Sequence, residues 1–216
     1  MTALKPVCKA TLPPLQGGMQ TAPQDLLARL AALDIETTTY EHPAVFTVAE
    51  AAALRGELPG GHCKCLFLKD RKDGLWLVVA LEDRRIDLKA LSDFLGAHRF
   101  SFGSAPLLAE ILGVTPGSVT PFALLNDTQC QVQPLLDAEM LTYDPLNYHP
   151  LTNTKTTALA PAGLLKFIVS CGHRPRIVNF HEIGLTPPAA QAGEAAGRAA
   201  GTACQKPAQS PSSSSS

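Results

Sequence analysis

The chain has 216 residues, of which 45% are hydrophobic, and 18 basic and 19 acidic residues leave a formal net charge of −1. This length suits one well-packed domain or two small ones. A near-neutral chain is not expected to coat nucleic acid through bulk charge, although a local basic patch can still grip one. The chain contains no run of 18 apolar residues, so no transmembrane helix is expected. Its N-terminus lacks the continuous apolar core of a signal peptide. We therefore expect a cytoplasmic protein.

Composition divides the chain into three parts. Residues 1–20 are punctuated by Pro and Gly and are expected to form a flexible tail. Residues 184–216 are a low-complexity run of Ala, Gly, Pro and Ser, too poor in large apolar groups to offset the entropy of ordering, so we predict disorder. The working domain is therefore expected to span residues 21–183.

The first part of this domain predicts two helices and a strand between them. Thr21 and Gln24 have the spacing of a capping box and predict a helix whose leucines lie on one side. Residues 36–42 are rich in Thr and Tyr and predict a strand. Thr47 then caps a second predicted helix over residues 48–56.

The middle of the domain predicts a hairpin followed by two short helices. Residues 63–70 and 75–81 read as strands, and the turn at 71–74 closes on a glycine. Such a turn requires an antiparallel pair. Residues 87–96 and 104–113 each combine a cap at one end with glycine at the other, which is typical of a short helix.

The last part predicts a strand over residues 121–127, an amphipathic helix over 158–173 and a final strand over 176–183. Strands and helices interleave, yet the hairpin forces an antiparallel pair. We therefore predict a single α/β domain with a mixed, partly antiparallel sheet packed by helices.

Common catalytic and metal-binding signatures are absent or weak. There is no P-loop, nucleophile elbow, HExxH motif or dinucleotide-binding GxGxxG. The segment "HCKC" at residues 62–65 suggests a zinc site, with Cys171 and His173 as distant partners. Cys-x-Cys is tighter than usual zinc spacing, however, and thiols facing a core are favoured, so we predict no metal.

Four further features have both a plain and a functional interpretation. Lys64 opens a strand, where it is either a surface lysine or a fixed positive charge aimed at an anion or oxyanion. Gly117 and Pro121 form an ordinary turn or a backbone wall along a pocket. His149 alone reads as a core histidine, and residues 152–157 as a polar edge strand.

Together these segments are more specific than any one of them. "EHPAVFTVAEA", "GGHCKCLFLKD", "GVTPGSVTPFALLND" and "YHPLTNTKTTAL" occur in this order and are followed by "PAGLLKFIVSCGHRPRIVNF". Over about residues 22–183 the chain resembles the aminoacyl-tRNA deacylase family that contains the editing domain inserted in bacterial prolyl-tRNA synthetases. The likeness is greatest to its freestanding members, the alanyl-tRNA(Pro) deacylases, or prolyl-tRNA synthetase associated domain-containing proteins.

The resemblance implies a barrel-like mixed sheet of the YbaK/aminoacyl-tRNA synthetase-associated domain type. It implies hydrolysis of the ester between a wrong amino acid and tRNA, helped by the substrate's own ribose hydroxyl, without metal or cofactor. The matching positions imply that Lys64 and His149 are catalytic. They also imply substrate-binding roles for Cys65, Gly117, Pro121, Asn153 and Thr154.

One position departs from the family pattern, because the family's asparagine after the lysine is Cys65 here. A thiol is a weak hydrogen-bonding group, so activity could be reduced or specificity altered. Three readings follow: a trans-editing hydrolase for Ala-tRNA(Pro), a deacylase for Ser, Thr or Cys esters, or a module that binds tRNA or a synthetase without hydrolysis.

An editing activity would explain the polar run at residues 152–157, which includes Asn153 and Thr154. A synthetase discriminates poorly against a smaller amino acid, because each methylene is worth only about 1–3 kcal/mol, and a second site too small for proline can hydrolyse alanine esters. We expect this run to line the site. The expected partners are the tRNA(Pro) acceptor end and, as a candidate, prolyl-tRNA synthetase, with phosphate contacts from Lys69, Arg71, Lys72, Arg84 and Arg85.

Overall fold

The computed structural model describes residues 21–43 and 58–183. The two predicted tails and the predicted helix over residues 48–56 lie outside these ranges. Among the described residues, no helix combines the length and the apolar character needed to cross a membrane.

One mixed sheet organises the described part of the chain. Its strands follow the order β1-β7-β6-β2-β3-β5-β8, and β4 pairs with β2 beside this path. The pairs β2–β6, β3–β5 and β5–β8 are parallel and the others antiparallel. The strands are β1 (Thr37–Glu41), β2 (Gly61–Lys69), β3 (Leu75–Leu81), β4 (Ser101–Phe102), β5 (Val132–Asp137), β6 (Leu146–Tyr148), β7 (Lys155–Leu159) and β8 (Arg176–Val178).

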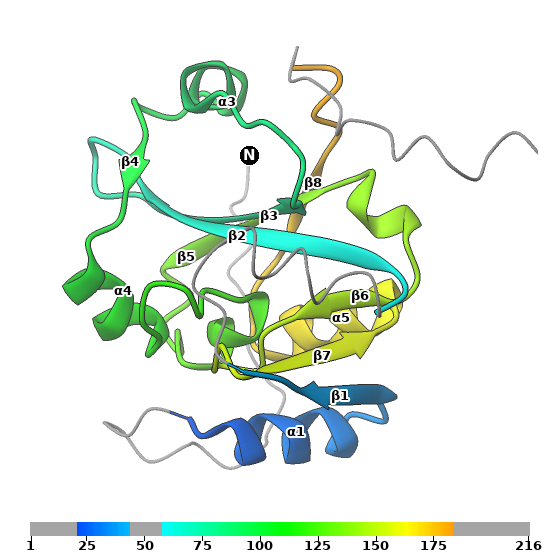
Figure 1. The fold of residues 1–216 in the computed structure, drawn as a ribbon. Coiled ribbons are helices and arrows are strands. Elements are labelled where there is room, and N and C mark those ends of the chain that lie inside the picture. Colours follow the sequence, from blue (N-terminus) through cyan, green and yellow to red (C-terminus); the bar gives the residue numbers. More distant parts are fainter. Residues whose placement is uncertain (1–20, 44–57, 184–216) are drawn as a thin grey trace, which may run out of the picture.

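Helices pack around this sheet, with α1 along β1 at one end of the molecule and α3 at the other (Figure 1). The helices are α1 (Pro23–Ala32), α3 (Leu88–Leu95), α4 (Ala105–Leu112) and α5 (Pro161–Ser170), and η1 (Pro121–Leu125) and η2 (Met140–Thr142) are short 3₁₀ turns. Both α3 and α4 have the predicted cap and a left-handed terminal glycine. The predicted mixed α/β fold is confirmed.

The two faces of β2 belong to two separate cores. Cys63, Cys65 and Phe67 pack with the larger core, which also contains the rings of Phe122 and Tyr148. Leu66 and Leu68, one residue out of phase, pack with the smaller core next to α3. Because side chains alternate along a strand, Lys64 points to the same side as Leu66 and Leu68.

The predicted hairpin is confirmed, with β2 and β3 antiparallel from Cys63–Leu81 to Lys69–Leu75. Asp70 organises its turn, because Oδ1 accepts hydrogen bonds from the backbone N–H groups of Lys72 and Gly74. This carboxylate therefore orders the turn that carries Arg71 and Lys72.

Other predicted elements are wrong in position or type. Ala22, not Thr21, is the N-cap of α1, and the Thr21 hydroxyl instead donates to Asn126 Oδ1 at 2.7 Å. Residues 121–125 form η1 rather than a strand, because proline begins the turn and Thr120 caps it. Of the predicted helix over residues 158–173, the first two residues belong to β7, and α5 begins at the helix-compatible proline.

Candidate active site

One face of the sheet gathers polar side chains from three strands. The parallel register pairs His62 on β2 with Asn147 on β6. Lys64 lies two residues after His62 on β2, and His149 lies two residues after Asn147, just past the end of β6, so side-chain alternation assigns both to this face. Thr156 on β7 faces the same way. We call this surface the polar face.

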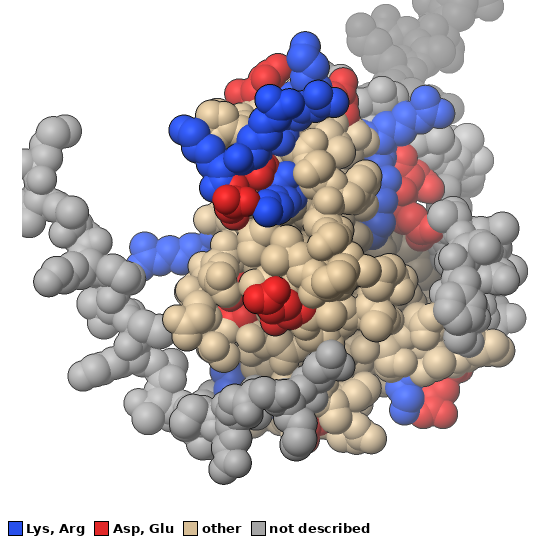
Figure 2. Space-filling view, turned by 90° about the vertical axis from the view of Figure 1, so that its left-hand side faces the viewer, with Lys and Arg blue, Asp and Glu red and all other residues tan. Residues whose placement is uncertain are grey.

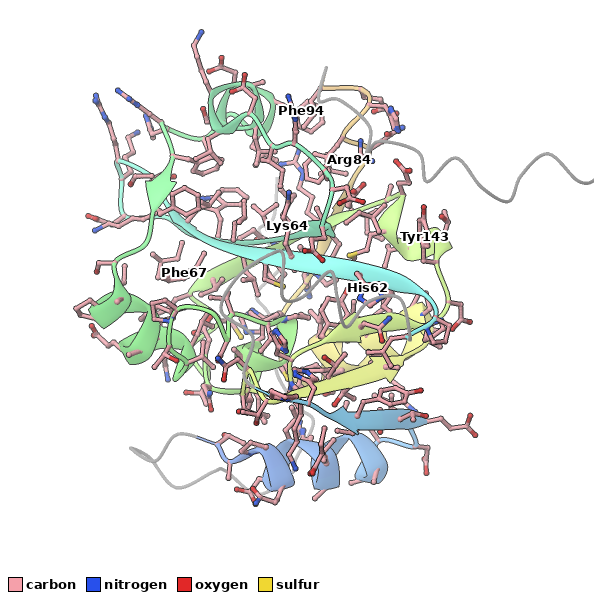
Figure 3. All side chains as sticks on the ribbon, in the orientation of Figure 1. His62, Lys64, Phe67, Arg84, Phe94 and Tyr143 are labelled. Atoms are coloured by element: carbon pink, nitrogen blue, oxygen red, sulfur yellow. The ribbon has the colours of Figure 1, made fainter. Side chains whose placement is uncertain are left out.

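Lys64 is half-buried on β2, with its ammonium held by the turn that follows β3 (Figure 3). Nζ donates to Glu82 O at 2.8 Å and also to Arg84 O. An ammonium has three N–H groups, so these contacts leave one for a substrate oxygen. The pKa of Lys64 is lowered, chiefly because burial disfavours its charged form, while the carboxylates of Glu82 and Asp83 oppose this effect.

Arg84 anchors the turn that holds Lys64. Its side chain is fully buried, donates from Nε to Asp137 Oδ2 at 3.2 Å and pairs through Nη2 with Glu139. His181 adds a contact to the same Glu139 carboxylate at 3.0 Å. A guanidinium enclosed in this way has no surface for a phosphate, so we remove Arg84 from the expected tRNA contacts.

His149 is held in one tautomer. Its Nδ1 lies 2.9 Å from Lys155 O, and because a carbonyl oxygen only accepts, Nδ1 carries the proton and Nε2 the lone pair. The pKa of His149 is lowered mainly because burial disfavours the charged ring, and the nearby His42 lowers it further. The ring is therefore neutral, with a basic nitrogen, near neutral pH.

A second histidine, His42, lies beside His149. Their ring centroids are 6.0 Å apart, and His42 Nε2 lies 2.9 Å from Thr156 Oγ1. The backbone N–H of His42 donates to Thr154 O. No sequence motif assigned a role to His42, although each of the two histidines is followed by proline.

Asn153 and Thr154 lie in the turn between β6 and β7 rather than in a strand. β7 begins at Lys155 and pairs with β1 on one side and β6 on the other, so the plain interpretation of residues 152–157 as an edge strand is wrong. Leu151 in this turn has φ +62°, a left-handed conformation that is rare for a bulky residue and concentrates at functional sites. The turn carries the polar run to the border of the polar face.

Gly117 and Pro121 stand at opposite ends of one loop. Gly117 has φ +90° and an added Cβ would meet nothing within 4 Å, so this turn faces open space. Pro121 is buried at the start of η1, whose Phe122 packs edge-on against Tyr148 and Phe167. Only the glycine end of the loop is thus exposed.

Cys65 points away from Lys64, into the larger core. Burial raises the pKa of Cys65 well above its usual value, and raises the pKa of Cys63 to about 12. Both thiols therefore remain protonated at neutral pH. His173, one of the distant partners considered for a zinc site, donates from Nδ1 to Val132 O at 3.1 Å. The described residues contain no group of three side chains that could hold a metal ion.

The remaining basic candidates are accessible. Arg71, Lys72 and Arg85 are exposed, and Lys69 is half-exposed in an ion pair with Asp73 at 2.7 Å. Figure 2 shows Lys and Arg side chains gathered over the end of the molecule formed by α3, β4 and the β2–β3 turn.

A family model described as the aminoacyl-tRNA editing domain matches residues 42–167. The chain is 41% identical to prolyl-tRNA synthetase associated domain-containing protein 1 of Danio rerio over 170 residues, which is 76% of this chain and 92% of the relative. It is 35% identical to the prolyl-tRNA editing protein ProX of Acetoanaerobium sticklandii over 153 residues, covering 70% of this chain and 93% of that protein.

Solved structures agree on the fold. A crystal structure provisionally assigned to a trans-editing enzyme for prolyl tRNA synthetase superposes with a TM-score of 0.56 at 21% identity, covering 72% of this chain and 92% of that one. The structure of hypothetical protein APE2540 gives a TM-score of 0.58 at 21% identity, over 71% of this chain and 97% of the other.

Proposed function

Because this chain belongs to the aminoacyl-tRNA editing domain family, we propose that it is an aminoacyl-tRNA deacylase that removes alanine from mischarged tRNA(Pro). The observation that supports the proposal is that side-chain alternation assigns Lys64 and His149 to the same face of the sheet, each two residues beyond the paired His62 and Asn147. The neutral amide of Asn147 and hydroxyl of Thr156 share this face, which suits binding of a ribose and an ester.

The reaction is hydrolysis of one ester bond. Water attacks the carbonyl carbon, the resulting tetrahedral intermediate loses the ribose oxygen, and the products are free alanine and tRNA. His149 Nε2, which carries a lone pair in the observed tautomer, accepts a proton from the water or from the ribose hydroxyl that assists it. The third N–H of Lys64 donates to the developing oxyanion or to the terminal phosphate.

Selection of alanine is assigned to the loop from Gly117 to Pro121. A small site admits a methyl side chain and excludes the proline ring, which is the second sieve of double-sieve editing. Gly117 keeps the loop free of a side chain where it faces open space. Asn153 and Thr154 complete the substrate-binding set at the border of the polar face, whereas Cys65 points to the opposite side of β2, into the larger core, and is not part of this set.

The tRNA is held by the basic end of the molecule. Lys69, Arg71, Lys72 and Arg85 are proposed to contact phosphates of the acceptor end, a sequence-independent interaction that weakens as salt rises. Prolyl-tRNA synthetase is the candidate protein partner, because the relatives carry its name.

The test is deacylation of Ala-tRNA(Pro), measured beside Pro-tRNA(Pro) and Ala-tRNA(Ala), with Lys64→Ala as the inactive control. Rapid loss of alanine from tRNA(Pro) alone, abolished in the variant, supports the proposal. If the protein hydrolyses seryl, threonyl or cysteinyl esters in preference to the alanyl ester, its substrate is one of these and not Ala-tRNA(Pro). Tight tRNA binding without turnover would instead indicate a binding module that has lost the reaction, with Cys65 in place of the family asparagine as the proposed cause.

A further inference from the structure

Asn147 is a buried amide in the centre of the polar face, with 4% of its surface exposed. Its Nδ2 donates to Pro59 O at 3.0 Å and more weakly to Gly61 O at 3.4 Å. Its Oδ1 is buried and has no hydrogen-bond partner in the described part of the chain. A buried acceptor left without a donor destabilises the folded protein, so the retention of this amide calls for an explanation.

The orientation of this amide is fixed by its neighbours. Both atoms that it contacts are backbone carbonyl oxygens, which only accept hydrogen bonds. Turning the amide over would set oxygen against oxygen, so the nitrogen must face Pro59 and Gly61. The atom left over is therefore an acceptor, and the ligand group that satisfies it must be a donor.

The position of Asn147 indicates which part of a substrate it meets. It lies two residues before His149 on the same side of the chain, about 7 Å away along an extended strand. Its low exposure suits the small aminoacyl end of the substrate rather than the long ribose-phosphate chain. On an alanyl group the ester oxygens accept and the methyl group is apolar, so the α-amino group is the only donor.

We propose that Asn147 Oδ1 accepts a hydrogen bond from the α-amino group of the aminoacyl ester. This inference rests on the proposed function and adds a residue that reads the amino acid itself. The contact orients the carbonyl carbon toward His149, while the Nδ2 bonds hold residues 59–61 in place. Asn147 thereby requires an amine on the acyl group, whereas the Gly117 loop limits its size.

The experiment compares two esters of tRNA(Pro), alanyl and propionyl, which differ only in the α-amino group. Because the α-ammonium group itself activates the alanyl ester, each kcat/KM is divided by the uncatalysed hydrolysis rate of the same ester. After this correction, the wild-type protein is expected to prefer the alanyl ester by at least about tenfold. Asn147→Ala should lose this preference, whereas the surface control Asn179→Ala should keep it. A variant that merely loosens residues 59–61 would slow both esters by the same factor, and that result would overturn the proposal.

A binding measurement separates this proposal from the proposed function. Non-hydrolysable amides of 3′-amino-adenosine, carrying either an alanyl or a propionyl group, are titrated into the wild-type protein by calorimetry. Tighter binding of the alanyl compound supports the amine contact even if no ester is turned over. Equal affinities for the two compounds would contradict the amine contact. Because this titration uses only the wild-type protein, its outcome does not depend on whether Asn147→Ala folds.

Discussion

His42 and His149 lie next to each other at the border of the polar face, with their ring planes inclined at 52°. Each ring has Nδ1 against a backbone carbonyl, Pro43 O for His42 and Lys155 O for His149. Both rings thus carry their proton on Nδ1 and have a basic Nε2. A positive charge on the His42 ring disfavours a charge on His149 and so contributes to the lowered pKa of His149.

The first prediction concerns the pH profile of this pair. His42→Gln removes a charge that lowers the pKa of His149, so the acid limb of kcat/KM for Ala-tRNA(Pro) should move to higher pH. Hydrolysis rates measured between about pH 5 and 8 test this, with the exposed His98→Gln as control. An acid limb that stays in place in His42→Gln would mean that His42 does not influence the catalytic ring.

The second prediction links His149 to stability. Its pKa is lowered in the folded protein, so above an unfolded value of about 6.5 both states are neutral and its stabilising contribution is fully present. As pH falls below this value toward the folded pKa, the unfolded chain binds the proton first and that contribution is lost. Urea denaturation at about pH 7.5 and 5 should therefore show a smaller acid loss for His149→Gln than for wild type. Equal losses would contradict the lowered pKa.

The third prediction isolates the charge of Lys64. Lys64→Met keeps most of the apolar stem but removes the donor to Glu82 O and the N–H assigned to the substrate. Deacylation of Ala-tRNA(Pro) should fall by about a hundredfold or more, as for loss of an oxyanion donor. The exposed Lys89→Met serves as control, and retained activity in Lys64→Met would remove this lysine from the mechanism.

The fourth prediction uses two neighbouring arginines with opposite surroundings. Arg84 is buried against Asp137, so Arg84→Met leaves a buried charge unpaired and should lower the free energy of unfolding by about 3–5 kcal/mol. Arg85 is exposed, and Arg85→Met should leave stability almost unchanged. Urea denaturation of the two variants measures the difference.

The same pair should behave in the reverse way in tRNA binding. Arg85→Met is expected to weaken binding and to reduce the dependence of log affinity on log salt by about one unit or less. If binding by Arg85→Met equals that of wild type at every salt concentration, this residue is not a phosphate contact.

The fifth prediction distinguishes two effects of a side chain at Gly117: backbone strain, which lowers stability, and obstruction of the amino-acid site, which lowers activity. Gly117 and Gly96 both have positive φ, and at both an added Cβ meets nothing within 4 Å. Alanine at either position should therefore destabilise the protein to a similar degree, about 1 kcal/mol or somewhat more. Only Gly117→Ala should reduce deacylation, because Gly96 ends α3. Equal activities of the two variants would exclude the Gly117 turn from the amino-acid site.

The sequence predicted elements bounded by local signals and missed those that depend on distant pairing. Caps and terminal glycines located α3 and α4. β5 was missed because it contains Pro134, and proline argues against a central strand, yet β5 lies between β3 and β8. The five consecutive buried residues of η1 have no period to tell a strand from a helical turn.

The candidate site shows the same division. Lys64 and His149 were found because family motifs mark them, whereas their shared face depends on the β2–β6 register, which a single sequence does not reveal. His42 gains its neighbour only through the pairing of β1 with β7. The open oxygen of Asn147 depends on two carbonyls brought up by a separate segment.

The family match covers residues 42–167, but the sheet extends beyond both limits. β1 pairs with β7 over five positions, and β8 pairs with β5 at the other end. A fragment cut at the limits of the match would leave β7 and β5 with unpaired backbone edges, to which other chains can add strands. Such a fragment should aggregate, so production of the enzyme for crystals or assays must begin before α1 and end after β8.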